Sequence, residues 1–241
     1  MKLRINPKLE IGVKQIADDL RCVVIDDFLL NPQELVDYAC NNRQHFLMPE
    51  LAYPGAVMPV DNSLLAELNR FIRFEMGRIF LFSRAGINCQ SQYSLATLQP
   101  ADFTWIQRLC HTDPGLVPGK ANYAGLIYLF ANPEMGGTGF FSWRNQAFWQ
   151  EMTEKQLTNP NAGLDDLKER YKMFRDPPSY MTESNEAAEL LDHVPARFNR
   201  FVFYSGDRPH GAFITRPELL NSDPSAGRLT LNTFVSALQK T

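Results

Sequence analysis

The chain has 241 residues, of which 44% are hydrophobic, 12% aromatic and 21% charged, and these proportions exclude a disordered chain, a collagen-like repeat and a bundle of membrane helices. Its formal net charge is −3 at pH 7, so it has no excess of basic side chains to neutralise phosphates or anionic lipids. We therefore expect neither nucleic acid nor a membrane as a partner, and a single domain over residues 1–241.

The amino-terminal sequence and the cysteines indicate a cytoplasmic protein. Residues 1–10 lack the apolar stretch of a secretory signal. The longest uncharged apolar run, residues 121–133, is shorter than a membrane span requires. The cysteines at positions 22, 40, 89 and 110 match neither a Cys-x-x-Cys motif nor a dense disulfide framework. We expect all four to be reduced thiols.

Residues 1–90 are expected to supply a strand and supporting helices. An apolar run at 22–30 predicts a buried strand. Asn31, Pro32 and Glu34 then form the start signal of a helix that extends to about Asn41. A second helix, ending near Gly77, is predicted by apolar residues at helical spacing: Leu64, Leu65, Leu68, Phe71, Ile72 and Met76. Both helices are expected to brace one face of a sheet.

Residues 91–236 are expected to form the core of the fold. They consist mostly of short apolar runs separated by Pro, Gly, Asn and Asp, which are typical of strands and turns. Strands and helices do not alternate regularly, which disfavours a doubly wound parallel sheet. The predicted class is mainly β with flanking helices, as a sandwich or barrel. The predicted strands are 93–98, 105–110, 125–130, 138–143, 200–204, 211–215 and 228–236.

A polar segment at about 145–196 interrupts these strands and favours helices. We expect it to be an insertion within the domain, and its apolar side chains must bury against something. We expect a lid over the open end of the sandwich, from which substrate selectivity would follow. The alternative is a decoration packed on the outer face of a sheet. The apolar side chains are Phe148, Trp149, Met152, Tyr171, Met173, Phe174 and Tyr180.

The tripeptide His111-Thr112-Asp113 is the first motif that points to chemistry. At positions i and i+2 of an extended segment, an imidazole and a carboxylate leave the same face and can reach one metal ion. His210, which follows the predicted strand at 200–204 and a turn, is a plausible third ligand. Two histidines and one carboxylate leave open positions on a metal and suit Fe(II) oxygen chemistry. A solvated His-Asp pair at a turn is the alternative, and Cys110 should point away from the site because strand neighbours face opposite sides.

An arginine near the carboxyl end indicates an anion site. The strand at 228–236 alternates in polarity and places Arg228, Thr230 and Asn232 on one face. Arginine binds carboxylates bidentately, and a nearby hydroxyl adds a second hydrogen bond, which would suit a dicarboxylate cosubstrate. A surface ion pair at the start of the strand is the alternative.

These motifs resemble, in their order, the iron- and 2-oxoglutarate-dependent oxygenases, and the nearest branch is the prolyl 4-hydroxylase-like one. The resemblance covers about residues 90–236 and, more weakly, 23–30. It implies a double-stranded β-helix, which is a jelly-roll, cupin-like sandwich with iron at its mouth. The motifs are His111-x-Asp113, the run 126–129, Gly136-Gly137-Thr138-Gly139-Phe140, the run 200–204, His210 and Gly227-Arg228.

The same resemblance implies the roles of individual residues. His111, Asp113 and His210 would bind Fe(II) and form the catalytic centre, while Arg228 would bind the distal carboxylate of 2-oxoglutarate. The cosubstrate would also contact two hydroxyl residues, Tyr128 and Thr230. The gap of 18 residues between His210 and Arg228 exceeds the usual ten or so, so Arg216 is the second candidate for the anion ligand.

The implied activity is an O2-dependent hydroxylation of a small molecule, amino acid or peptide, with 2-oxoglutarate as cosubstrate. Two alternatives stay open: a non-catalytic metal-binding jelly-roll module, and a zinc-dependent hydrolase that uses the same three ligands. We expect His45 and His193 to lie outside the site, His45 near a helix end and His193 within the insertion.

Overall fold

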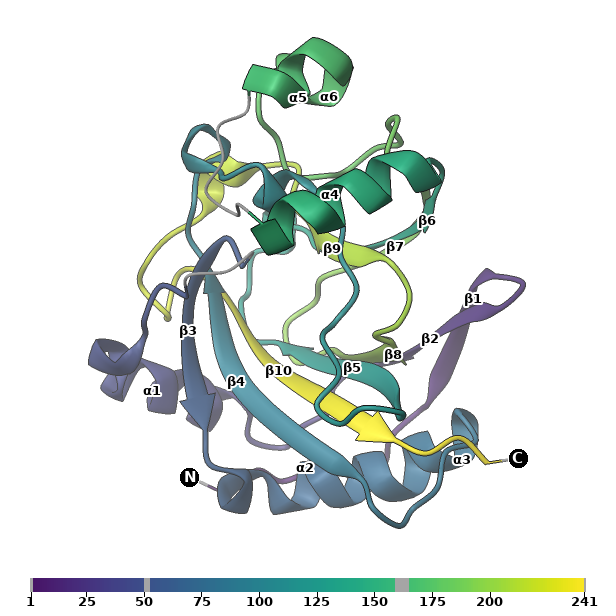
Figure 1. The fold of residues 1–241 in the computed structure, drawn as a ribbon. Coiled ribbons are helices and arrows are strands. Elements are labelled where there is room, and N and C mark those ends of the chain that lie inside the picture. The colour runs from purple at the N-terminus through teal and green to yellow at the C-terminus, as the bar shows by residue number, and fades with distance from the viewer. Residues whose placement is uncertain (1, 50–52, 159–164, 241) are drawn as a thin grey trace.

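The computed structural model describes residues 2–49, 53–158 and 165–240, and within them the chain forms two antiparallel sheets (Figure 1). The larger sheet has seven strands in the order β1-β2-β8-β5-β10-β4-β3, and the smaller has three in the order β7-β6-β9. The larger sheet comprises β1 (Gly12–Ala17), β2 (Leu20–Ile25), β3 (Gly55–Val60), β4 (Asn88–Ala96), β5 (Ala121–Tyr128), β8 (Phe201–Ser205) and β10 (Arg228–Ala237). The smaller comprises β6 (Gly137–Trp143), β7 (Ala188–Pro195) and β9 (His210–Phe213).

Helices cover one face of the larger sheet (Figure 1). They are α1 (Pro32–Asn41), α2 (Ala66–Phe71) and α3 (Gly77–Ile79), with a π-helical turn at Ile72–Met76 between the last two. The main apolar cluster joins this sheet to the helices, whereas a second cluster, which includes Leu126, Phe140 and Tyr204, joins the two sheets. This arrangement confirms a mainly β fold with flanking helices. Among the described residues, no helix is long and apolar enough to cross a bilayer.

Most predicted strands are present, but the one predicted at 105–110 is wrong. These residues form a 3-10 turn at Ile106–Arg108. Trp105 is buried in a cluster with residues of the insertion, including Phe148 and Phe174, so packing against helices rather than strand pairing accounts for its apolar character. The strands β1 and β3 were not predicted.

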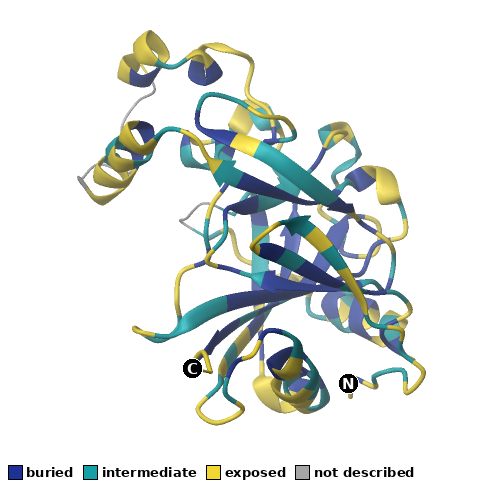
Figure 2. Ribbon diagram, turned by 90° about the vertical axis from the view of Figure 1, so that its right-hand side faces the viewer, coloured by how far each residue is buried: buried dark blue, intermediate teal, exposed yellow. Residues whose placement is uncertain are grey.

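The insertion is helical only in its first part. It contains α4 (Gln146–Thr158), α5 (Asp165–Arg170) and α6 (Lys172–Arg175), which stand at one end of the molecule and expose much of their surface (Figure 2). The prediction of a helical segment up to about 196 is wrong at its end, because β7 pairs with β6 and belongs to the smaller sheet. The polar residues of β7, Glu189, Asp192 and His193, concealed this strand.

A buried arginine joins the helical part of the insertion, which comprises α4, α5 and α6 and is called the helical segment below, to the chain that precedes His111. Arg108 is 7% exposed, and its guanidinium donates hydrogen bonds to the main-chain oxygens of Met173, Phe174 and Asp176. These bonds satisfy carbonyl groups at the end of α6. The helical segment and the turn at Ile106–Arg108 therefore form one packed unit.

Asn199, which precedes β8, joins the chain after β2 to the end of β5. Its side-chain amide donates to the Leu29 oxygen and accepts from the Leu29 amide, each at 2.9 Å, and its main-chain amide donates to Tyr128 at 2.8 Å. The residue is buried and has a φ of 62°, a conformation that asparagine adopts more readily than most residues.

We expect Asn199→Ala to lower the free energy of unfolding by roughly 3 kcal/mol, because it leaves two buried main-chain groups unpaired and forces alanine into a positive φ. Asn199→Gly should lose less, since glycine tolerates that φ. Urea denaturation checks both, with Gln33→Ala on the exposed face of α1 as the control. A loss below about 0.5 kcal/mol for Asn199→Ala would contradict this role.

Candidate metal centre

A short antiparallel bridge brings the two predicted histidine ligands together. The His111 amide donates to the His210 oxygen at 2.9 Å, and the His210 amide donates to the His111 oxygen at 2.8 Å. Asp113 is anchored by its own amide, which donates to the Gly206 oxygen at 2.8 Å. A Cβ atom at Gly206 would lie 2.7 Å from Asp113 Oδ2, so glycine leaves the space that this carboxylate needs.

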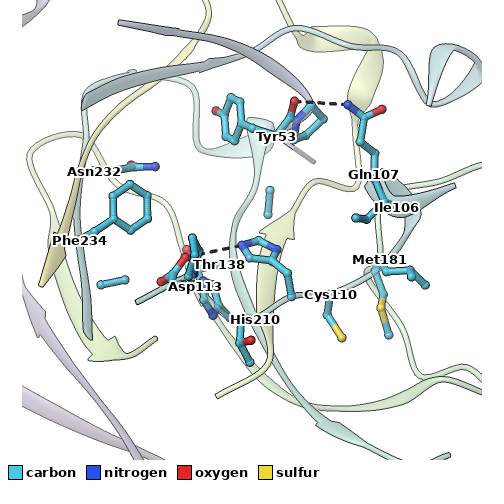
Figure 3. A pocket seen from close by; sticks show the side chains of 18 of the residues that line it. Tyr53, Ile106, Gln107, Cys110, Asp113, Thr138, Met181, His210, Asn232 and Phe234 are labelled. Carbon is cyan, nitrogen blue, oxygen red and sulfur yellow. Dashed lines mark hydrogen bonds and ion pairs between the residues drawn. The ribbon is translucent and has the colours of Figure 1, made fainter. Parts of the chain in front are cut away.

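The side chains of His111, Asp113 and His210 form the only group of potential metal ligands of this kind in the described part of the chain. Each offers one ligand atom, and these atoms lie within 4.8 Å of one another. Asp113 Oδ1 is 3.9 Å from His111 Nε2, and Asp113 Oδ2 is 3.5 Å from His210 Nε2. Figure 3 shows the Asp113 and His210 side chains turned toward each other.

Two features of this group fit a bound metal ion. Asp113 Oδ2 is buried without a hydrogen bond of ordinary geometry, which is costly unless a cation completes its coordination. His210 Nδ1 lies 2.9 Å from the Arg208 oxygen, an arrangement that places the proton on Nδ1 and leaves the Nε2 lone pair toward Asp113. Two imidazoles and a carboxylate suit Fe(II) and also accept zinc.

The electrostatics favour a neutral His111 and an ionised Asp113, as a metal requires, but they also favour a proton on His210, which a metal must displace. Burial and the neighbouring His210 lower the pKa of His111. Its side chain is half exposed and lines the pocket described below. Burial opposes ionisation of Asp113, but the two histidines outweigh it and lower the pKa of the carboxyl. Burial likewise opposes a charge on His210, and Asp113 outweighs it and raises that pKa.

The ligand group opens into a large pocket between the two sheets. Its volume is about 1450 Å³, and α4 contributes part of the lining, including Trp149 and Met152. The Cys110 thiol belongs to an apolar cluster with Phe141 and Met181, and burial raises its pKa to about 12. Cys110 is therefore a neutral thiol beside the ligand group, and the four cysteines, all of them described, form no disulfide.

Arg228 lies in the same pocket and is 4% exposed. Its guanidinium donates to the Met135 oxygen at 3.0 Å and to the Gly137 oxygen at 2.7 Å, and it lies over the Phe130 ring. Among the residues that the structure describes, no carboxylate forms an ion pair with it. A buried guanidinium without a counterion is costly, and an anion that entered the pocket would relieve that cost.

The other predicted cosubstrate residues differ in their position. Thr230 lines the pocket beside Arg228. Tyr128 is fully buried, and its hydroxyl lies 2.8 Å from Thr138 Oγ1, which does line the pocket. Arg216 is half exposed and pairs with Glu218 and Glu134, so its charge is already matched at the surface.

Several residues that line the pocket were not predicted. Tyr53 and Tyr204 come from distant parts of the chain, and burial raises the pKa of Tyr53 to about 12, so its hydroxyl stays neutral. Asn232, which strand alternation places on the same face of β10 as Arg228 and Thr230, also lines the pocket, as that alternation indicates. His45 is exposed on a 3-10 turn, and the His193 ring stacks on Phe213; neither belongs to the ligand group.

Comparisons with known proteins identify a family and a fold. A model described as "Family of unknown function (DUF6445)" matches residues 7–235, and no curated protein matches the sequence. EvdO2 from Micromonospora carbonacea var. aurantiaca has a TM-score of 0.50 and 9% identity, with 95% of this chain and 94% of EvdO2 covered. This likeness shows a shared fold. EvdO2 has also been crystallised in complex with 2-oxoglutarate.

Two further structures are similar at lower scores. HygX from Streptomyces hygroscopicus, crystallised with nickel, 2-oxoglutarate and hygromycin B, has a TM-score of 0.44 and 11% identity, with 89% of this chain and 81% of HygX covered. A prolyl-4-hydroxylase from Pseudomonas putida has a TM-score of 0.43 and 13% identity, with 91% of this chain and 93% of that enzyme covered.

We expect the protein to bind Ni(II), a redox-stable substitute for Fe(II), with an affinity that falls as the pH falls. Because Asp113 raises the pKa of His210, a proton competes with the metal below that pKa. The affinity should therefore decrease by up to about tenfold for each pH unit below it. Calorimetric titrations at pH 8 and pH 6 measure this, and equal affinities at the two values would contradict it.

Alanine variants of single histidines test which histidines bind the metal. His111→Ala should weaken Ni(II) binding by more than about a hundredfold, because it removes a direct ligand. His45→Ala should bind like the wild type. If His111→Ala retained stoichiometric metal of normal affinity, the ligand assignment would be wrong.

Proposed function

The chain belongs to the DUF6445 family of unknown function, and we propose that it is an Fe(II)- and 2-oxoglutarate-dependent oxygenase that hydroxylates its substrate. We propose further that its two sheets form a double-stranded β-helix and that residues 1–241 act as one domain. EvdO2, which shares the fold, has been crystallised with 2-oxoglutarate, and this supports the choice of cosubstrate.

The observation that carries this proposal is the buried Arg228 in the pocket of the ligand group. A metal-binding module needs no second, buried cation, and a hydrolase with a single zinc ion likewise needs none. A dicarboxylate cosubstrate accounts for both the ligand group and the buried Arg228, because one end can chelate the metal and the other can pair with the guanidinium. The exposed, paired Arg216 is a poorer partner for a carboxylate.

We assign the residues of the pocket as follows. His111, Asp113 and His210 would hold iron, which supplies the activation of O2 and the oxidative decarboxylation of 2-oxoglutarate to succinate and CO2. Arg228 binds and orients the distal carboxylate, and Thr230 adds a hydroxyl group beside it. The Arg208 oxygen fixes the ring of His210 through Nδ1.

The helical segment serves as a lid in this proposal. Trp149, Met152 and Leu157 of α4 line the pocket, so this helix covers one side of the reacting centre and limits the access of water. The buried Arg108 ties the segment to the chain just before His111. A decoration on an outer sheet face would not contribute to the pocket lining.

With Fe(II), 2-oxoglutarate and air, the protein should release succinate slowly without any added substrate. Arg228→Ala should raise the KM for 2-oxoglutarate at least about tenfold, which corresponds to roughly 1.4 kcal/mol for the lost charged hydrogen bond. Its metal affinity should stay near normal. A succinate assay over a range of 2-oxoglutarate concentrations gives both parameters.

Arg216→Ala is the matched control and should change this KM by less than about twofold, because its charge is exposed and paired. A larger effect for Arg216→Ala than for Arg228→Ala would reverse the assignment. No succinate from a protein that binds iron would refute the oxygenase proposal.

A further inference from the structure

The pocket is unusually rich in uncharged amide side chains. Six of the eleven glutamines in the sequence line it, together with one asparagine. A primary amide can both donate and accept hydrogen bonds without charge. The buried Asn232 Oδ1 has no hydrogen-bond partner among the described residues, whereas both ends of the Gln107 amide are already bonded to the Thr104 amide and the Tyr53 oxygen. The residues are Gln90, Gln92, Gln107, Gln146, Gln150, Gln156 and Asn232.

Two walls of the pocket carry these amides. On the larger sheet, Asn232 of β10 is in register with Gln92 of β4, and Phe234 is in register with Gln90. On α4, Gln146, Gln150 and Thr153 follow one another at helical spacing and line the same pocket. Figure 3 shows Asn232 and Phe234 on one side of the pocket and Gln107 on the other, with Asp113 and His210 below and between them.

The charged side chains of the lining either have a role in binding the metal and the cosubstrate or are exposed. His111, Asp113 and His210 form the ligand group, and Arg228 is assigned to the cosubstrate in the proposed function. Two more are exposed: Arg144, which pairs with Glu189 at 3.1 Å, and Glu154 on α4. Within the described residues, the buried part of the pocket therefore holds no further unpaired cation for a substrate carboxylate, and Asp113 is its one buried carboxylate.

The dimensions leave room for an extended ligand. Inward side chains on β10 run from Arg228 through Asn232 to Phe234, a distance of about 20 Å at roughly 3.4 Å per residue. A volume of about 1450 Å³ also exceeds the roughly 300–1,000 Å³ of typical small-molecule pockets. A free amino acid would fill only a fraction of this space and would leave its two charges unpaired.

We propose that the substrate is an uncharged, extended peptide segment, which binds between the sheet wall of Gln90, Gln92 and Asn232 and the helix wall of Gln146 and Gln150. Side chains on one face of a strand recur about every 6.8 Å, and so do the amide groups that point to one side of an extended peptide. Successive amides of the wall can therefore meet successive amides of the ligand. This inference deepens the proposed function and rests on it.

Binding tests the inference without turnover. The protein loaded with Ni(II) and 2-oxoglutarate is titrated with a library of N-acetylated, C-amidated hexapeptides of uncharged residues, and tryptophan fluorescence is followed, because Trp149 lines the pocket. We expect saturable quenching by these peptides. Mixtures of free amino acids, and maltohexaose as a neutral chain without amides, should bind at least about tenfold more weakly. Library pools with Lys or Asp at the central positions should also bind more weakly.

Turnover gives a second readout. With Fe(II) under air, the peptides that bind should raise succinate release above the rate without substrate. Gln92→Leu and Gln150→Ala each remove one amide and should raise the peptide KM by about threefold to tenfold, with a smaller effect on kcat. The matched control is Gln99→Ala, whose side chain bonds to the Pro217 oxygen outside the pocket, and it should leave the peptide KM unchanged.

Several results would overturn the inference. They are preferential binding of free amino acids, of maltohexaose or of the charged pools; equal peptide KM values for Gln92→Leu and Gln99→Ala; and no response to any peptide. Succinate release without substrate distinguishes a failure of the proposed oxygenase activity from a failure of the proposed substrate class. If it persists while the peptides fail, the oxygenase proposal stands and the substrate class is wrong.

Discussion

The buried guanidinium of Arg228 is the constraint on which the site depends. Arg228 is the first residue of β10 in the larger sheet. Its guanidinium donates to the main-chain oxygens of Met135 and Gly137, and these residues lie at the start of β6 in the smaller sheet. This contact joins the two sheets at one end of the pocket. Two carbonyl groups offset only part of the cost of burying a charge, so the folded protein keeps an affinity for an anion at this position.

Two glycines make this contact possible. Gly136 has a φ of 94°, and a Cβ atom there would lie 2.0 Å from the Phe213 oxygen; a Cβ atom at Gly137 would lie 2.0 Å from the Val194 oxygen. The chain at these positions therefore passes closer to β9 and β7 than any other residue type would allow. The close approach fixes the carbonyl groups that hold Arg228, and β9 also begins with the ligand His210.

The sequence was most informative where the spacing of residues determines what they can reach. His111 and Asp113 share a face because they are two residues apart in extended chain, and the alternation of β10 points Arg228, Thr230 and Asn232 into one pocket. The mainly β class followed from the short apolar runs. The pairing of His111 with His210 is a contact between distant segments, and no local pattern predicts it.

Long-range packing also explains what was missed. The apolar run that begins at Trp105 predicts a strand. Trp105 instead packs against Phe148 and Phe174, which lie more than forty residues later in the sequence. Three of the eight residues of β7 are polar, namely Glu189, Asp192 and His193, so this strand was assigned to the helical insertion. The glutamines of the pocket are spread over a strand, a turn and a helix, and only the three-dimensional fold shows that they share one cavity.

The central claim is that a metal at the His111–Asp113–His210 group and 2-oxoglutarate at Arg228 occupy this pocket together. An anaerobic titration of the Fe(II)-loaded protein with 2-oxoglutarate tests it most directly, because chelation of iron by the cosubstrate produces a weak visible charge-transfer absorption. We predict that this absorption saturates at one 2-oxoglutarate per iron. Stoichiometric iron binding without any such absorption would contradict the claim.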